Sequence, residues 1–173
     1  MAKLRKFCAY RRLERPYTRV SKFRNKAFVR NRPNSKVIRY TAGNQKKQFD
    51  YKLSLVSKDS MQIRHNAIES GRQSANKILD KQIGKMNYFL KLRIYPHHIL
   101  RENPLASGAG ADRMSTGMKK SFGKAVGVAS QVKEDQVLMD LYVDKSQLKL
   151  ARKALDRYNY KLPIKTAIVE TKA

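Results

Sequence analysis

Apolar and polar residues alternate at several places along this chain, the pattern of strands that bury one face. The clearest runs lie at residues 49–55, 88–94, 126–132 and 137–143. Shorter runs at 37–40 and 164–169 are also predicted strands, and a turn is expected at 42–44. The polar segment 133–135 predicts that the strands on either side of it pair as a β-hairpin.

Two other segments carry apolar residues at helical spacing. The first is predicted to begin at Asp59, with Gln62 three residues further on as in a capping box, and to end at Gly84. The second is predicted to begin at Asp144 and to end before Pro163. Each has one apolar stripe that should face a sheet. The stripes are Met61, Ile68, Ala75, Ile78 and Leu79 in the first helix, and Leu148, Ala151, Leu155 and Tyr158 in the second.

The predicted order is strand, strand, helix, strand, long loop, then strand, strand, helix, strand. This order indicates an α+β fold, in which a two-layer domain has a mixed β-sheet with both helices on one face. We expect an N-terminal arm over residues 1–36 and an α+β body over residues 37–173. The long loop, residues 96–124, is inserted between strands of the body.

The N-terminal arm is strongly basic and has neither helix nor strand periodicity. It offers little contiguous apolar surface, so we expect it not to fold alone. Its cations suit phosphates, and its aromatic rings suit unpaired bases. Two states stay compatible, a solvated tail in free solution and an arm ordered on RNA. The candidate RNA contacts are Arg5, Lys6, Arg11, Arg12, Arg15, Arg19, Lys22, Arg24, Lys26, Arg30 and Arg32.

The whole chain shares this charge: 39 Lys and Arg stand against 13 Asp and Glu, a formal net charge of +26 on 173 residues. Such self-repulsion favours an anionic partner, and nucleic acid is the commonest one. The loop 96–124 is rich in Gly and Pro, and Lys119, Lys120 and Lys124 add cations that could meet RNA. The alternative for this loop is a flexible surface segment with no ligand.

The amino-acid sequence of the loop is similar to that of a known family. The segments are Tyr95-Pro-His-His-Ile, Ser107-Gly-Ala-Gly-Ala-Asp-Arg113, Thr116-Gly-Met118 and Ser121-Phe-Gly-Lys124 followed by Val126-Gly. Together they resemble the universal large-subunit ribosomal protein called sixteen in bacteria and ten-e in archaea and eukaryotes, most closely its archaeal branch. The resemblance implies an α/β-hammerhead arrangement, which periodicity alone does not distinguish from a ferredoxin-like sandwich.

The resemblance also implies a function. It places the protein in the cytoplasm, in the ribosome, as a structural constituent that binds large-subunit ribosomal RNA and lies beside neighbouring ribosomal proteins. The loop would lie near the peptidyl transferase centre and the transfer RNA acceptor end, and late assembly factors are further possible partners. The loop residues implied are Arg101, Ser107, Gly108, Ala109, Gly110, Ala111, Asp112 and Arg113. The alternative is a general RNA chaperone or assembly factor outside the mature ribosome.

The sequence gives little indication of a metal site, an enzyme or a membrane protein. One cysteine and three histidines give no metal-ligand spacing, so no metal or cofactor is expected. No phosphate-binding motif or set of nucleophile and base emerges, so we do not expect an enzyme. His65 is expected on a helix surface, and His97 and His98 at a strand end. No apolar run predicts a membrane span, and no leader pattern predicts secretion.

Overall fold

A computed structural model describes residues 3–18, 21–27, 29, 31–115, 117–118 and 121–172. It confirms the α+β class. The strands are β1 Thr41–Gly43, β2 Tyr51–Ser57, β3 Met61–Arg64, β4 Tyr88–Leu92, β5 His98–Glu102, β6 Lys124–Val132, β7 Val137–Val143 and β8 Thr166–Lys172. The helices are α1 His65–Gln82, α2 Ala111–Met114 and α3 Leu148–Asn159, with 3-10 turns η1 Phe7–Ala9, η2 Arg24–Lys26 and η3 Lys145–Gln147.

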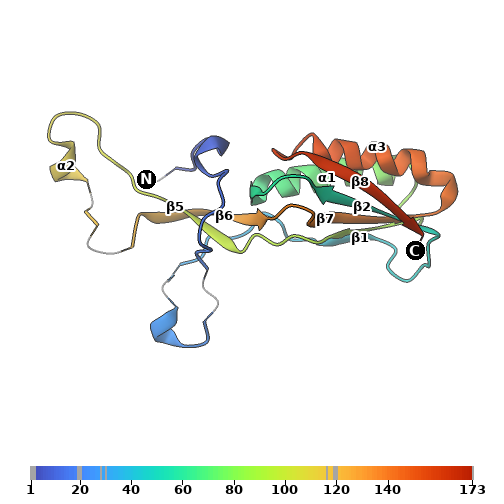
Figure 1. The fold of residues 1–173 in the computed structure, drawn as a ribbon, viewed down its shortest axis with the longest axis horizontal. Coiled ribbons are helices and arrows are strands. Elements are labelled where there is room, and N and C mark those ends of the chain that lie inside the picture. The colour runs from blue at the N-terminus through green and yellow to red at the C-terminus, as the bar shows by residue number, and fades with distance from the viewer. Residues whose placement is uncertain are drawn as a thin grey trace.

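The strands form two sheets rather than one. A five-stranded sheet has the order β1-β4-β7-β2-β8, and a three-stranded sheet has the order β3-β6-β5. Every pair in the described part of the chain is antiparallel, so the predicted mixed sheet is wrong. Figure 1 shows the small sheet beside the large one, with β6 running on into β7. The body is therefore elongated along the direction in which the two sheets follow each other.

The segment between β6 and β7 does not close the predicted hairpin. Asp135, with a φ of 59°, donates its N–H to Ser57 O at 3.0 Å, and Ser57 N–H donates to Gln136 O at 3.0 Å. The amide of Glu134 donates to Ser60 Oγ at 2.9 Å. These bonds tie the connection to the passage from β2 to β3. Two neighbouring chain segments thus cross together from one sheet to the other.

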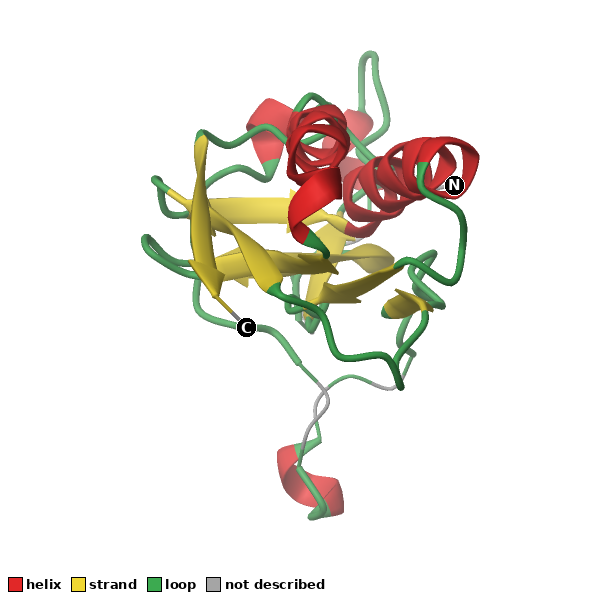
Figure 2. Ribbon diagram, turned by 90° about the vertical axis from the view of Figure 1, so that its right-hand side faces the viewer, coloured by secondary structure: helices red, strands yellow, loops and turns green. Residues whose placement is uncertain are grey.

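The core lies between the large sheet and the two long helices. Leu53, Leu90 and Leu141 occupy one row across β2, β4 and β7, and all three are fully buried. Figure 2 shows α1 and α3 on the same side of the strands, as the apolar stripes predict. Gly71 permits the close approach of the helices, because an added Cβ would stand 2.7 Å from the Tyr158 ring. The predicted packing of both helices on one face of a sheet is therefore confirmed for the large sheet.

The first helix begins later in the chain than the sequence pattern predicts. Residues 61–64 form β3, which pairs with β6 in the register Met61↔Val132 to Arg64↔Ala129, and α1 begins only at His65. Strand pairing therefore overrides the capping-box pattern at Asp59. His65 is buried rather than exposed, and its Nδ1 accepts the Lys36 N–H at 3.1 Å. Burial lowers the pKa of His65, with nearby cations adding to the effect.

The first strand also lies a few residues later in the chain than the sequence pattern predicts. Residues 37–40 precede β1, and the strand itself occupies 41–43, where a turn was expected. Gly43 has a φ of +88°, and a Cβ there would lie 2.1 Å from Tyr88 O, so only glycine lets this short edge strand lie against β4. The turn follows at Asn44, whose N–H donates to Tyr88 O at 2.9 Å.

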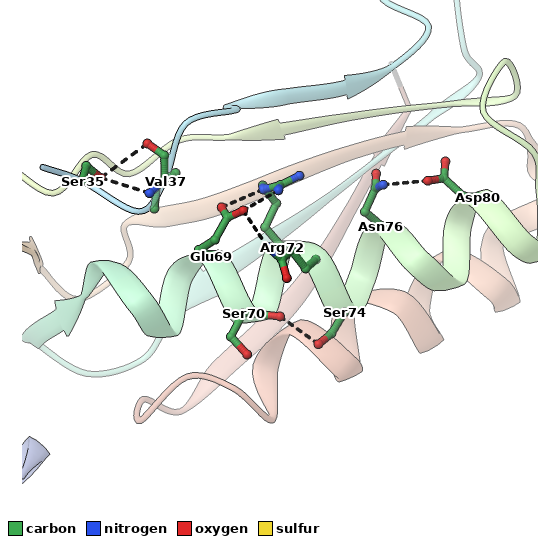
Figure 3. Close-up of polar contacts among 9 residues, drawn as sticks. Ser35, Val37, Glu69, Ser70, Arg72, Ser74, Asn76 and Asp80 are labelled. Carbon is green, nitrogen blue, oxygen red and sulfur yellow. Dashed lines mark hydrogen bonds and ion pairs between the residues drawn. The ribbon is translucent and has the colours of Figure 1, made fainter.

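Polar side chains pair with one another along α1 (Figure 3). Arg72 Nε donates to the Glu69 carboxylate at 2.9 Å, and Asn76 Nδ2 donates to Asp80 Oδ2 at 2.7 Å. The hydroxyl of Tyr88, on β4, lies 2.6 Å from Asp80 Oδ1. Burial, together with this bond to Asp80, raises the pKa of Tyr88 above its usual value. The helix end and the strand are therefore joined through a neutral phenol.

Candidate nucleic-acid interface

Within the described residues, no α-helix packs over either face of the small sheet, and the N-terminal arm covers both. Successive residues of a strand point to opposite faces. Leu100 and Ala129 therefore lie on one face, where they pack with Tyr10, while their neighbours Ile99 and Val128 lie on the other face with Val29. The arm passes from the first face to the second, and its few apolar residues complete two small cores. Without the arm, both faces of the small sheet would be open.

Backbone hydrogen bonds fasten the arm to the sheet. Gln62, on β3, is buried, and its side-chain amide donates to the carbonyl oxygens of Tyr10 and Arg12. Its own N–H donates to Arg11 O at 3.1 Å. On β5, Ile99 N–H donates to Tyr17 O at 2.9 Å. The arm is thus held mainly by main-chain groups, which leaves its long basic side chains free to point outward.

His98 provides another attachment point for the arm. Its side chain is buried, and Nδ1 accepts the Tyr17 N–H at 2.9 Å. Burial is the largest influence on its pKa, which lies below the usual value for histidine. His98 therefore acts as a neutral acceptor that packs against the arm, while the adjacent His97 is exposed and lies on the Tyr95 ring, with centroids 4.4 Å apart.

The cations predicted for the arm are exposed. A few also bind within the protein: Arg5 Nε lies 2.9 Å from the Glu102 carboxylate, and an Arg32 amino group donates to Pro96 O at 2.9 Å. Arg19 and Arg30 lie outside the described residues. The exposed set is Arg5, Lys6, Arg11, Arg12, Arg15, Lys22, Arg24, Lys26 and Arg32. This segment therefore presents positive charge along its whole described length.

The predicted loop 96–124 is not irregular throughout. It contains β5 and the one-turn helix α2, and the part beyond β5 extends away from the body (Figure 1). Arg101 lies within β5, at the base of this extension rather than at its tip. Its guanidinium stacks on the Tyr17 ring at 3.6 Å and donates to Phe122 O at 3.4 Å. Arg101 therefore joins the arm to both ends of the loop.

The tip of the loop is open to solvent. Ser107, Gly108, Ala109, Gly110, Asp112 and Arg113 are exposed, and Ala111 is half-buried. Gly108 and Gly110 have φ values of +117° and +78°, and nothing lies within 4 Å of a Cβ built on either. Backbone conformation, not crowding, therefore requires glycine at these positions. Lys124 is exposed at the start of β6, and Lys119 and Lys120 lie outside the described residues.

The arm and the loop base meet in one groove of about 640 Å³. Arg5, Tyr10 and Glu14 line it from the arm, and Glu102 and Phe122 line it from the loop. Burial and a hydrogen bond to Glu102 raise the pKa of Tyr10. The structure therefore brings together two segments that are about a hundred residues apart in the sequence.

For three residues of this arrangement, the sequence did not indicate that they contact the arm. Gln62 lies in a pattern that favours a helix start, His98 is one of two adjacent histidines, and Glu102 is a single acid in a basic segment. Each gains its role from partners more than fifty residues away. Among the described residues, no group of three His, Cys, Asp or Glu side chains could hold a metal ion. No helix in that part of the chain is long and apolar enough to span a membrane.

A small α+β domain with a basic arm and a basic loop is typical of a protein that binds structured RNA. The family model for ribosomal protein L16p/L10e matches residues 14–169, and the chain belongs to this family. Proteins of this family are structural components of the ribosome, not enzymes, and the family locates the chain in the ribosome, in the cytoplasm.

Individual relatives agree with the family match. The large ribosomal subunit protein uL16 of Archaeoglobus fulgidus is 45% identical over 163 residues, which are 94% of this chain and 90% of that protein. The protein of the same name from Methanococcus maripaludis is 45% identical over 98% of this chain and 95% of its own length. That of Staphylothermus marinus is 42% identical over 89% and 85%, respectively. The expected similarity to archaeal members is therefore confirmed.

Proposed function

We propose that this protein is a structural constituent of the large ribosomal subunit whose arm and loop bind ribosomal RNA. The observation that carries the proposal is the way in which the arm is held. Main-chain bonds and a few apolar side chains fix it on both faces of the small sheet, and its cations remain exposed. An arm attached in this way can neutralise phosphates without losing its place on the protein.

Phosphate contacts would supply most of the affinity and fix the orientation of the protein. Contacts with base edges and 2′-hydroxyl groups would supply specificity. Roughly ten phosphate contacts would make log K fall with log salt at a slope of about −9 on duplex-like sites. A general RNA chaperone would show a similar slope, so salt dependence alone does not distinguish the two functions.

For the loop we propose a position near the peptidyl transferase centre and the transfer RNA acceptor end. Its exposed tip, its positive φ glycines and its cations suit close approach of the backbone to RNA. Neighbouring ribosomal proteins and late assembly factors are the further partners expected in the assembled particle. Under this proposal the loop serves translation, while the arm and the body hold the protein in place.

The decisive experiment uses large-subunit particles stripped of this one component. Labelled protein is added at physiological salt with an excess of bulk RNA as competitor. Saturation at one copy per particle, resistant to the competitor, is the expected result. If the competitor removes the protein, its charge acts generically and the RNA chaperone function is favoured instead.

A deletion tests the division of work between arm and loop. Removing residues 107–114 takes away only exposed or half-buried side chains of the tip. The shortened protein should still bind stripped particles, because the arm and body keep most phosphate contacts, but peptide synthesis by those particles should fall. Loss of particle binding would contradict this division.

A further inference from the structure

The face of the large sheet that the helices leave open carries an aromatic row. Phe89 on β4, Tyr142 on β7 and Lys52 on β2 are direct cross-strand neighbours. Their chain neighbours Leu90 and Leu141 point into the core, so this row lies on the opposite face. The two rings are half-buried, and their centroids lie 5.5 Å apart at a tilt of 30°. The exposed part of this aromatic surface has no explanation in the packing of the core.

The connection between β1 and β2 converts this row into a groove. The groove has a volume of about 550 Å³. The connection between β1 and β2, which lines it, lies at the end of the molecule opposite α2 (Figure 1). Its lining consists of three rings, two amides and one ammonium group. These belong to Phe49, Phe89, Tyr142, Gln45, Gln48 and Lys47. The groove is thus separate from the arm and the loop described above.

Charge on this face favours an anionic ligand. The ammonium groups of Lys47 and Lys52 lie 5.2 Å and 6.0 Å from the centroids of the Phe49 and Tyr142 rings. Three cations, Lys47, Lys52 and Arg93, stand here against two acids that pair with them, which leaves an excess of positive charge. Asp144 binds Lys47 at 2.7 Å. The buried Asp140 accepts a hydrogen bond from Ser54 Oγ at 2.6 Å and lies 3.6 Å from Lys52 and 3.5 Å from Arg93.

We propose that this groove binds an unpaired RNA nucleotide, with its base stacked on Phe89 and Tyr142. Aromatic rings stack on the π-face of any base, and a primary amide can both donate to and accept from a base edge. Lys47 and Lys52 would neutralise the adjacent phosphates. The proposal rests on the proposed function, since it adds a second RNA contact to a protein that binds ribosomal RNA. A stacked base and its flanking phosphates would use the rings, the amides and the cations together.

The chain contains no tryptophan, which allows a local test. Phe89→Trp keeps a ring that can stack and places one fluorophore in the groove. Tyr160→Trp is the matched control, because Tyr160 is an exposed ring, 79% accessible, at the end of α3. Each full-length variant is titrated with a fluorescein-labelled single strand of adenosine nucleotides, and binding is followed by anisotropy as well as by tryptophan emission.

We expect saturable quenching of the tryptophan in Phe89→Trp but not in Tyr160→Trp. Adding Tyr142→Leu to Phe89→Trp should weaken the quenching isotherm about tenfold, on the scale of one lost stacking contact. Adding Lys47→Gln should also weaken it, because a cation beside the phosphates is lost. Binding by anisotropy without quenching would overturn the nucleotide site and leave the proposed function intact. No binding by anisotropy would count against both.

A final measurement separates RNA from protein as the occupant. Phe89→Trp is incorporated into stripped large-subunit particles, and its emission is compared with that of the free protein. Quenching is the expected result. A blue shift without quenching would assign the groove to an apolar protein neighbour and would overturn the proposal.

Discussion

Gln62 offers the sharpest test of how the arm is attached. It is only 1% exposed, and its side-chain amide donates to the carbonyls of Tyr10 and Arg12. Gln62→Met keeps the length and most of the volume of the side chain but removes both donors. The backbone bond from Gln62 N–H to Arg11 O, and the pairing of β3 with β6, should persist.

The expected cost follows from the two lost bonds. Each contributes about 1 kcal/mol, and a buried carbonyl left without a donor costs about 1–3 kcal/mol, so about 3 kcal/mol in total is a reasonable expectation. That corresponds to roughly a hundredfold increase in the population in which this part of the arm is detached. The core of the large sheet contains neither carbonyl, so its stability should change little.

Two assays distinguish local from global effects. Trypsin cleavage after the exposed Arg11 and Arg12 should accelerate strongly in Gln62→Met. Hydrogen exchange of the amides of α3 should stay near the original rate. Gln73→Met is the matched control, because Gln73 is an exposed glutamine whose amide donates to Glu69 on the same helix. Equal cleavage rates in the two variants would refute the role assigned to Gln62.

Two further predictions concern the loop base and pH. Gly123 has a φ of +59°, and the Cβ added by Gly123→Ala would lie 2.6 Å from the Glu102 backbone, so the thermal midpoint measured by calorimetry should fall. Gly117→Ala is the control, because open space surrounds Gly117, and it should leave the midpoint unchanged. Burial lowers the pKa of His65 and His98, so the unfolded chain takes up protons first on acidification. Urea unfolding should therefore show full stability above about pH 6.5 and a loss below it. Replacing both His65 and His98 by asparagine should flatten the dependence of stability on pH. An unchanged slope would contradict the role given to these two histidines.

The sequence predicts local features of this fold better than long-range ones. Alternation identifies β2, β4, β6 and β7 to within two residues at each end, and β4 shows the cause most clearly, since it buries Tyr88, Leu90 and Leu92 on one face. It fails at β3, where strand pairing with β6 outweighs a helix-start pattern. It also cannot assign β6 and β7 to different sheets, since the turn between them bonds to Ser57 rather than to its own flanking strands.

For the candidate site, too, the sequence predicts local features better than long-range contacts. Charge and aromatic content predict that the arm contacts RNA, and composition predicts the exposed loop tip. Which residues hold the arm depends on partners far away in the chain, and Gln62 and His98 are ordinary in their local sequence. The position of Arg101 illustrates the limit: its residue type suggests a phosphate contact, whereas its guanidinium stacks on Tyr17 in the arm.

The position of β5 connects the arm and the loop physically. The loop leaves the body at Glu102, and this same residue binds Arg5 and influences Tyr10 in the arm. One residue earlier, Arg101 stacks on Tyr17 and donates to Phe122 at the returning end of the loop. An edge strand with these contacts keeps its place only while the arm covers it, because the arm supplies the apolar cover on both faces. We infer that RNA which fixes the arm also fixes the origin of the loop, so substitutions at the arm contacts should disturb the loop without touching its tip.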